Sequence, residues 1–102
     1  MNYIDAHAHI YPDGIAVKAA GSIGEFYHMD IAGDGRLTTL LERGKEAGIS
    51  KHLVHSVGIT PERVAHINDY LMKTAAQYPT RLVGFGTLHP GMKDVRVELR
   101  LI

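Results

Sequence analysis

The 102-residue chain contains no cysteine and no tryptophan. Without cysteine it can form no disulfide and offers no thiolate to a metal ion, which fits a reducing compartment, so we expect a cytoplasmic protein. Lys plus Arg and Asp plus Glu each number 11, so the formal net charge is zero. This balance does not indicate a surface for nucleic acid or for an anionic membrane, so we expect neither as a partner. We also expect no secretory signal and no membrane span, because no apolar run approaches the ~20 residues that cross a bilayer.

Histidine is the residue that stands out, with seven copies spread from His7 to His89. His7 and His9 end a short strand-like run, and residues two apart in a strand point to the same face. Both imidazoles could therefore converge on one divalent ion, with Zn–N bonds of about 2.0–2.1 Å. Asp5 is expected on the same face, one step back, where it would orient an imidazole. The alternative is that two histidines flank a strand end by chance, since His-x-His is a common pattern.

The hydrophobic pattern predicts strands that alternate with helices over a single domain, residues 1–102. Strands are expected at about 2–7, 51–57 and 81–87, and helices at about 35–47, 61–78 and 92–101. Residues 8–34 are expected to form a long connection that contains a short helix from Pro12 to Ala20. The last segment alternates like a strand, but the order of the elements favours a helix capped by Asp94. This alternation of strands and helices predicts an α/β fold of parallel βα units.

Four residues indicate where helices begin or end and where a loop is held. Gly48 is expected just past the end of the 35–47 helix, and Asp34 and Thr60 are candidate N-caps. Asn68 lies beside the apolar stripe of the 61–78 helix. If buried, its amide needs hydrogen-bond partners, so we expect Asn68 to fix a neighbouring loop.

Parallel sheets bind ligands at the carboxyl ends of their strands, and the histidines are distributed accordingly. His7, His9 and His89 fall at or just after predicted strand ends, His55 lies inside the second strand, and His28 lies in the 8–34 connection. A single histidine in a buried strand is more often a hydrogen-bonded core residue than a ligand. The sequence therefore predicts His7 and His9 as metal ligands. His28, His55 and His89 stay open as a third ligand or as residues that line the site.

The opening Ile4-Asp5-Ala6-His7-Ala8-His9, followed by Tyr11-Pro12, resembles the amidohydrolase-2 family. These are metal-dependent hydrolases and decarboxylases of TIM-barrel fold, including the aminocarboxymuconate semialdehyde decarboxylase group. The likeness continues through Leu53–Ser56, Ile67–Asp69, Tyr78-Pro79 and Leu82–Pro90. In the family, the histidines that match His7 and His9 bind the metal from the first barrel strand, and later strands supply further histidines and an aspartate. The resemblance thus implies a metal-dependent enzyme that acts on a small-molecule substrate. It implies a divalent metal ion, and Zn²⁺ is the ion that we expect.

A barrel of this kind has eight strands and about 250 residues. The chain supplies the first three βα units, so it is similar to the amino-terminal part of such an enzyme. We therefore expect weak metal binding, little or no catalysis by this chain alone, and self-association through the open edges of the unclosed barrel. The alternatives are a non-catalytic metal-binding or oligomerising module, and a structural remnant without activity.

Overall fold

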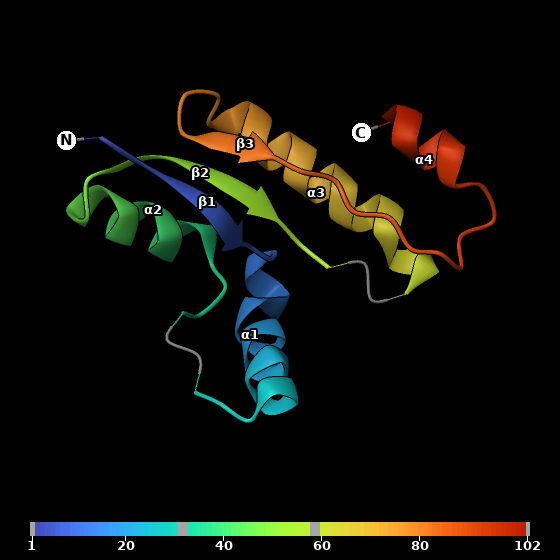
Figure 1. Cartoon of the computed structure of the whole chain (residues 1–102), viewed down its shortest axis with the longest axis horizontal. Helices are drawn as coiled ribbons and strands as arrows, with labels where there is room; N and C mark the ends of the chain where they lie inside the picture. Colours follow the sequence, from blue (N-terminus) through green and yellow to red (C-terminus); the bar gives the residue numbers. More distant parts are fainter. Residues whose placement is uncertain (1, 31–32, 58–59, 102) are drawn as a thin grey trace.

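The computed structural model describes residues 2–30, 33–57 and 60–101. Residues 1, 31–32, 58–59 and 102, which the predicted domain includes, lie outside the described residues. The elements in chain order are β1 (Tyr3–His9), α1 (Asp13–Tyr27), α2 (Leu37–Glu46), β2 (Ile49–His55), a 3-10 turn (Pro61–Arg63), α3 (Val64–Gln77), β3 (Leu82–Gly84) and α4 (Val95–Leu101) (Figure 1). Strands and helices alternate, which confirms the predicted α/β class.

The three strands form one parallel sheet in the order β1-β2-β3. The central strand β2 follows α2, and a parallel neighbour requires such a crossover because the chain must return to the same end of the sheet. The register pairs Asp5 with His52, Ala8 with Val54, and His9 with His55. The carboxyl ends of β1 and β2 therefore lie side by side, as parallel βα units require.

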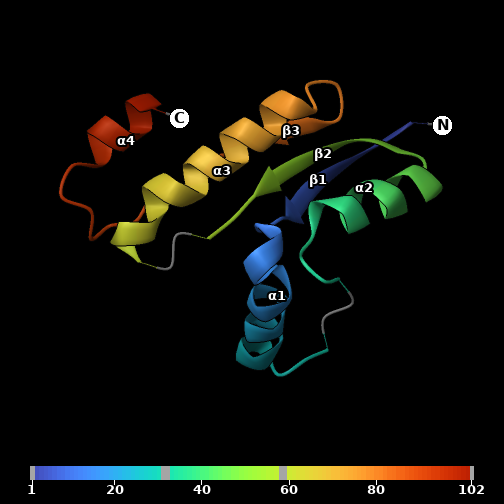
Figure 2. The same ribbon diagram turned by 180° about the vertical axis from the view of Figure 1, so that it is seen from behind.

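Helices α2 and α3 cover one face of this sheet, and the hydrophobic core lies between these helices and the sheet. The core cluster joins Leu41 of α2, Val54 of β2 and Leu71 of α3 with Ala8, Ile10 and Leu82. Leu41 and Leu71 come from different helices but share one cluster, so both helices cover the same face of the sheet. Figures 1 and 2 show α2 alongside β2 and α3 alongside β3.

The boundaries of all three strands differ from the sequence predictions. β1 covers Tyr3–His9 instead of 2–7, β2 covers Ile49–His55 instead of 51–57, and β3 covers Leu82–Gly84 instead of 81–87. β3 ends at Gly84, and further along the chain the backbone of Thr87 hydrogen bonds to the Asn68 side chain of α3. The longer β1 includes His9, which the sequence analysis placed just after the strand, as its last residue.

The helix boundaries also shift. α2 (Leu37–Glu46) lies within the predicted 35–47 range, and the predicted 61–78 helix is a 3-10 turn followed by α3 (Val64–Gln77). The predicted 92–101 helix starts later, as α4 (Val95–Leu101), because Asp94 accepts hydrogen bonds from the backbone N–H groups of Arg96 and Val97. These bonds cap the first turn and confirm a helix rather than a strand in this segment.

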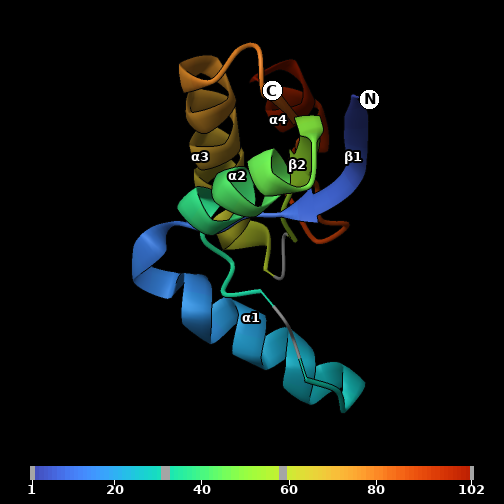
Figure 3. The ribbon, with the colours of Figure 1, turned by 90° about the vertical axis from the view of Figure 1, so that its left-hand side faces the viewer.

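The predicted 8–34 connection is largely helical, which corrects the sequence analysis. α1 has 15 residues and runs past the predicted end at Ala20 to Tyr27. Glycine costs only about 1 kcal/mol relative to alanine inside a helix, so Gly21 and Gly24, which lie beyond the predicted end, do not end the helix. Ala16, Ala20 and Gly24 form a buried stripe of small residues. Figure 3 shows α1 projecting from the carboxyl end of β1 and away from the layers formed by the sheet, α2 and α3.

The cap predictions are confirmed in part. Gly48 has a φ of +79°, the left-handed conformation expected after a helix. The residue at the N-cap of α2 is Arg36 instead of Asp34, and no side-chain bond caps the helix there. Asp34 accepts hydrogen bonds from the Arg36 N–H at 3.0 Å and from the Thr39 hydroxyl at 2.9 Å, so it stabilises the turn that precedes the helix. Thr60 does lie at the N-cap, in front of the 3-10 turn that starts at Pro61, but its side chain makes no cap bond.

Asn68 joins three segments of the chain and confirms its predicted structural role. It is 1% exposed. Its Nδ2 donates to the Thr87 carbonyl at 2.9 Å, and its Oδ1 accepts from the Thr87 N–H at 2.7 Å. Nδ2 also donates to Oε1 of the buried Glu98 at 2.8 Å. Asn68 thus attaches both the segment after β3 and α4 to α3.

Among the described residues, no helix has the length and apolar character needed to cross a membrane.

Candidate metal centre

Three histidines meet at the carboxyl ends of β1 and β2. His7, His9 and His55 each offer one ring nitrogen, and these nitrogens all lie within 4.8 Å of one another. The Nε2 atoms of His7 and His9 are 3.0 Å apart. The ring centroid of His55 is 4.2 Å from that of His7 and 5.1 Å from that of His9. His7 is exposed, whereas His9 and His55 are half-buried, so the cluster opens to solvent on one side.

The register of the parallel sheet brings this cluster together. His9 pairs with His55 across the β1–β2 ladder, so the two side chains project from adjacent strands at the same level. The Phe85 ring lies edge-on to His55 with centroids 6.0 Å apart. Phe85 stays in place because its N–H donates to the Val54 carbonyl at 2.9 Å. The side chains therefore lie on paired backbone rather than on a loop.

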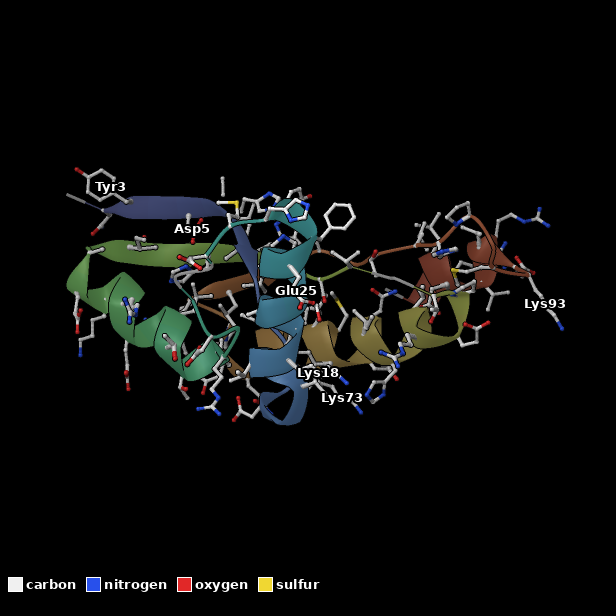
Figure 4. All side chains as sticks on the ribbon, turned by 90° about the horizontal axis from the view of Figure 1, so that it is seen from below. Tyr3, Asp5, Lys18, Glu25, Lys73 and Lys93 are labelled. Atoms are coloured by element: carbon white, nitrogen blue, oxygen red, sulfur yellow. The ribbon has the colours of Figure 1, made fainter. Side chains whose placement is uncertain are left out.

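A β-bulge separates Asp5 from the histidine cluster. Two residues lie between Asp5 and Ala8 on β1, but one residue lies between their partners His52 and Val54 on β2. The extra residue interrupts the regular alternation of faces. Asp5 therefore contacts His52, with 3.2 Å between Oδ2 and Nδ1, instead of sharing the face of His7 and His9 as the sequence analysis expected. Figure 4 shows Asp5 on the side of β1 that faces β2 and α2, and Tyr3 projecting away at the start of the strand.

The surroundings of the cluster favour neutral imidazoles. Burial lowers the pKa of His9 below its ordinary value of 6.5, and the His55 and His7 rings lower this pKa further, whereas the backbone of His55 acts in the opposite direction. Burial also lowers the pKa of His55, as does His7, whereas Asp5 acts in the opposite direction. A metal ion binds the neutral ring, so the lowered pKa values leave nitrogen lone pairs available at neutral pH.

Two ring nitrogens of the cluster lack partners. His9 Nδ1 and His55 Nε2 are buried and make no hydrogen bond within the described part of the chain. Buried polar atoms in folded proteins are usually satisfied. His9 turns its Nε2 toward His7, so an ion between these two rings would not bind the Nδ1 of His9, and the Nε2 of His55 is the unpartnered atom that such an ion could bind. Ligand nitrogens of a tetrahedral zinc site are about 3.3 Å apart when each Zn–N bond is about 2.0–2.1 Å. The 3.0 Å between the Nε2 atoms of His7 and His9 is close to this value, and the ring nitrogen of His55 lies within 4.8 Å of both rings' ligand atoms.

The structure does not gather the remaining predicted candidates into this cluster. His28 is exposed at the end of α1, where its φ of +53° closes the helix. His89 lies beyond β3, and its Nδ1 accepts a hydrogen bond from the Gly91 N–H at 2.9 Å. Of the three alternatives for a third ligand, His55 is thus the one that lies beside His7 and His9.

Sequence reasoning missed His52, which lies three positions before His55 on the same strand. His52 is 1% exposed and pairs with Asp5. Residues three apart in a strand point to opposite faces, so His52 faces the helix layer while His55 faces the cluster. The residue count between His52 and His55 could have assigned them to opposite faces. The partner of His52 depends on the strand register, which the sequence does not display.

Comparison with protein-family models, with curated proteins and with solved structures finds no match to this chain. The evidence on function therefore comes from the fold and from the candidate centre. Together they define an α/β protein with a three-histidine cluster at the carboxyl edge of a parallel sheet.

Proposed function

We propose that this chain binds a divalent metal ion, Zn²⁺ by the nature of its donors, through His7, His9 and His55. The observation that carries the proposal is the convergence of three imidazole nitrogens within 4.8 Å. Three histidines at the carboxyl ends of parallel strands occupy the position where such sheets bind their ligands. Three protein nitrogens also leave one position of a tetrahedral ion open, which is typical of catalytic rather than structural zinc.

We further propose that this centre belongs to a metal-dependent hydrolase or decarboxylase similar to the amidohydrolase-2 family, whose opening motif the sequence resembles. The parallel βα arrangement is compatible with the first units of a TIM barrel. A bound divalent ion would supply Lewis-acid polarisation of a substrate oxygen. The chain's own residues hold the ion through the two strands and keep two of its three ligands half-buried.

A second candidate function is metal binding without catalysis. The ligand cluster found among the described residues consists of histidines alone, and Asp5 is turned toward His52. Hydrolysis and decarboxylation also need a group that moves protons. A turnover assay of the Zn²⁺-loaded chain on an activated carboxylic ester separates the two functions. Turnover that disappears in His7→Ala/His9→Ala favours the enzyme, and its absence in the loaded wild-type chain favours the non-catalytic centre.

The metal-binding proposal is tested by elemental analysis of the purified chain after loading with Zn²⁺ and dialysis. We expect about one Zn²⁺ per chain in the wild type and loss of the ion in His7→Ala/His9→Ala and in His55→Ala. The matched control is His66→Ala, since His66 is an exposed histidine on α3 outside the cluster. Equal zinc content in all four proteins, or no zinc in the wild type, would contradict the proposal.

A further inference from the structure

We infer that Asp5 and His52 form a positioning pair that fixes the backbone of β1 where it presents His7 to the metal. The pair lies on the helix side of the sheet, behind the candidate centre. This inference rests on the proposed function, because it concerns how the same site is held in shape.

The first step of the argument is the bulge between Asp5 and Ala8. An extra residue in one strand interrupts the ladder and leaves a backbone group without its usual partner. Here the N–H of His7 donates instead to Oδ1 of Asp5, at 3.1 Å. The conformation of the backbone at His7 is therefore held by the Asp5 side chain.

The second step is the contact between Asp5 and His52. The other carboxylate oxygen, Oδ2, lies 3.2 Å from Nδ1 of His52. An ionised carboxylate can only accept, so the bond requires the hydrogen on Nδ1 of the ring. With Oδ1 bound to His7 and Oδ2 bound to His52, the carboxylate has a single orientation. His52 thereby determines where the acceptor for the His7 N–H lies.

The third step is the immobilisation of His52 by α2. The ring is 1% exposed. A Cβ atom added at Gly44 of α2 would lie 2.7 Å from Cε1 of this ring and would also overlap Nε2. The helix backbone thus packs directly against the imidazole, and Gly44 is the residue that leaves room for it. A continuous set of contacts connects α2, His52, Asp5 and the backbone of a metal ligand.

Such a pair is expected to affect metal affinity without touching the metal. Residues that orient metal ligands typically change metal affinity by about 10–100-fold when they are removed. Asp5→Ala removes both hydrogen bonds, and His52→Leu removes the donor to Asp5 while keeping an apolar side chain. His52→Asn keeps an N–H donor near the position of Nδ1. Asp69→Ala is the matched control, because Asp69 is an exposed carboxylate on α3.

The experiment measures the Zn²⁺ dissociation constant by competition with a chromogenic chelator, well below the unfolding temperature of every variant. The visible spectrum of each Co²⁺-loaded variant is recorded in parallel. This spectrum reports ligand geometry in the folded protein and is insensitive to a mere loss of stability. We expect Asp5→Ala and His52→Leu to bind Zn²⁺ about 10–100-fold more weakly with an altered Co²⁺ spectrum. We expect His52→Asn and Asp69→Ala to stay within about threefold of the wild type.

Wild-type affinity and an unchanged Co²⁺ spectrum in Asp5→Ala and His52→Leu would overturn the inference, even if both variants were less stable. So would equal weakening in His52→Asn and His52→Leu, because the hydrogen bond would then not be the cause. The wild type and His7→Ala/His9→Ala are measured first. If the wild type binds no metal, the proposed function fails and this inference fails with it. If the wild type binds metal but the pair has no effect, only the inference fails.

Discussion

His9 and His55 lie opposite each other on adjacent parallel strands, with ring centroids 5.1 Å apart and ring planes inclined by only 20°. They come from strands that α1 and α2 separate in the sequence. The relationship depends on strand register, so it completes a site that the local His-x-His motif only begins. The first prediction concerns how this pair titrates.

The metal-free protein is expected to lose stability as the pH falls below 6.5. Folding lowers the pKa of His9 and of His55 from 6.5, so the unfolded chain binds more protons as the pH falls below that value. The contribution of these rings is therefore fully present above pH 6.5 and is lost as the pH falls toward the lowered folded pKa values. Thermal unfolding with a chelator present, between about pH 7.5 and pH 5.5, measures this effect.

The matched variant for this titration is His9→Gln/His55→Gln, which should flatten the pH dependence because its side chains do not titrate. His66→Ala should keep the wild-type profile, since His66 is exposed. A midpoint that rises on acidification, or a double variant as pH-sensitive as the wild type, would contradict the assignment.

Replacement of Asn68 by alanine is expected to destabilise the protein by about 2–3 kcal/mol. The substitution removes both bonds to Thr87 and the bond to the buried Glu98. Chemical denaturation monitored by circular dichroism measures the change. Gln77→Ala, an exposed position on the same helix, should stay within about 0.5 kcal/mol of the wild type. Similar unfolding free energies for the two variants would show that the Asn68 bonds contribute little.

Two glycine-to-alanine substitutions are expected to change stability in opposite directions. Gly21 lies in α1, and an added Cβ would have nothing within 4 Å, so Gly21→Ala should stabilise the protein. The gain should be about 0.5–1 kcal/mol from helix propensity. At Gly44 the added Cβ would overlap the His52 ring, so Gly44→Ala should lower the unfolding temperature despite the same propensity gain. A stabilised Gly44→Ala protein would mean that His52 is not held by α2.

The sequence predicts the order of the elements well because their signals are local. The apolar spacing of α2 and α3 and the glycine after α2 are determined by neighbouring residues, and so is the Asp94 cap of α4. Asn68 was predictable for the same reason, since an amide beside an apolar stripe must find partners. The length of α1 was not predictable, because its three glycines weaken the helix locally, whereas its buried stripe of small residues depends on contacts with other segments.

The candidate site was predictable only in part. His7 and His9 carry a motif, but the choice of His55 over His28 and His89 depends on how β1 pairs with β2. The expectation for Asp5 assumed regular alternation along the strand, and a bulge of one residue changes the face of everything beyond it. Both outcomes follow from contacts between strands, which a single sequence does not record.

The central claim is that three imidazoles bind one ion, and zinc K-edge X-ray absorption of the Zn²⁺-loaded chain tests it most directly. The spectrum counts the histidine ligands of the ion. The account predicts three imidazoles in the wild type, from His7, His9 and His55. His55→Ala, which loses the ion on dialysis, is measured without dialysis and with zinc below the protein concentration, and should show one imidazole fewer. A wild-type spectrum with two imidazoles or fewer, or a ligand count that His55→Ala leaves unchanged, would contradict it.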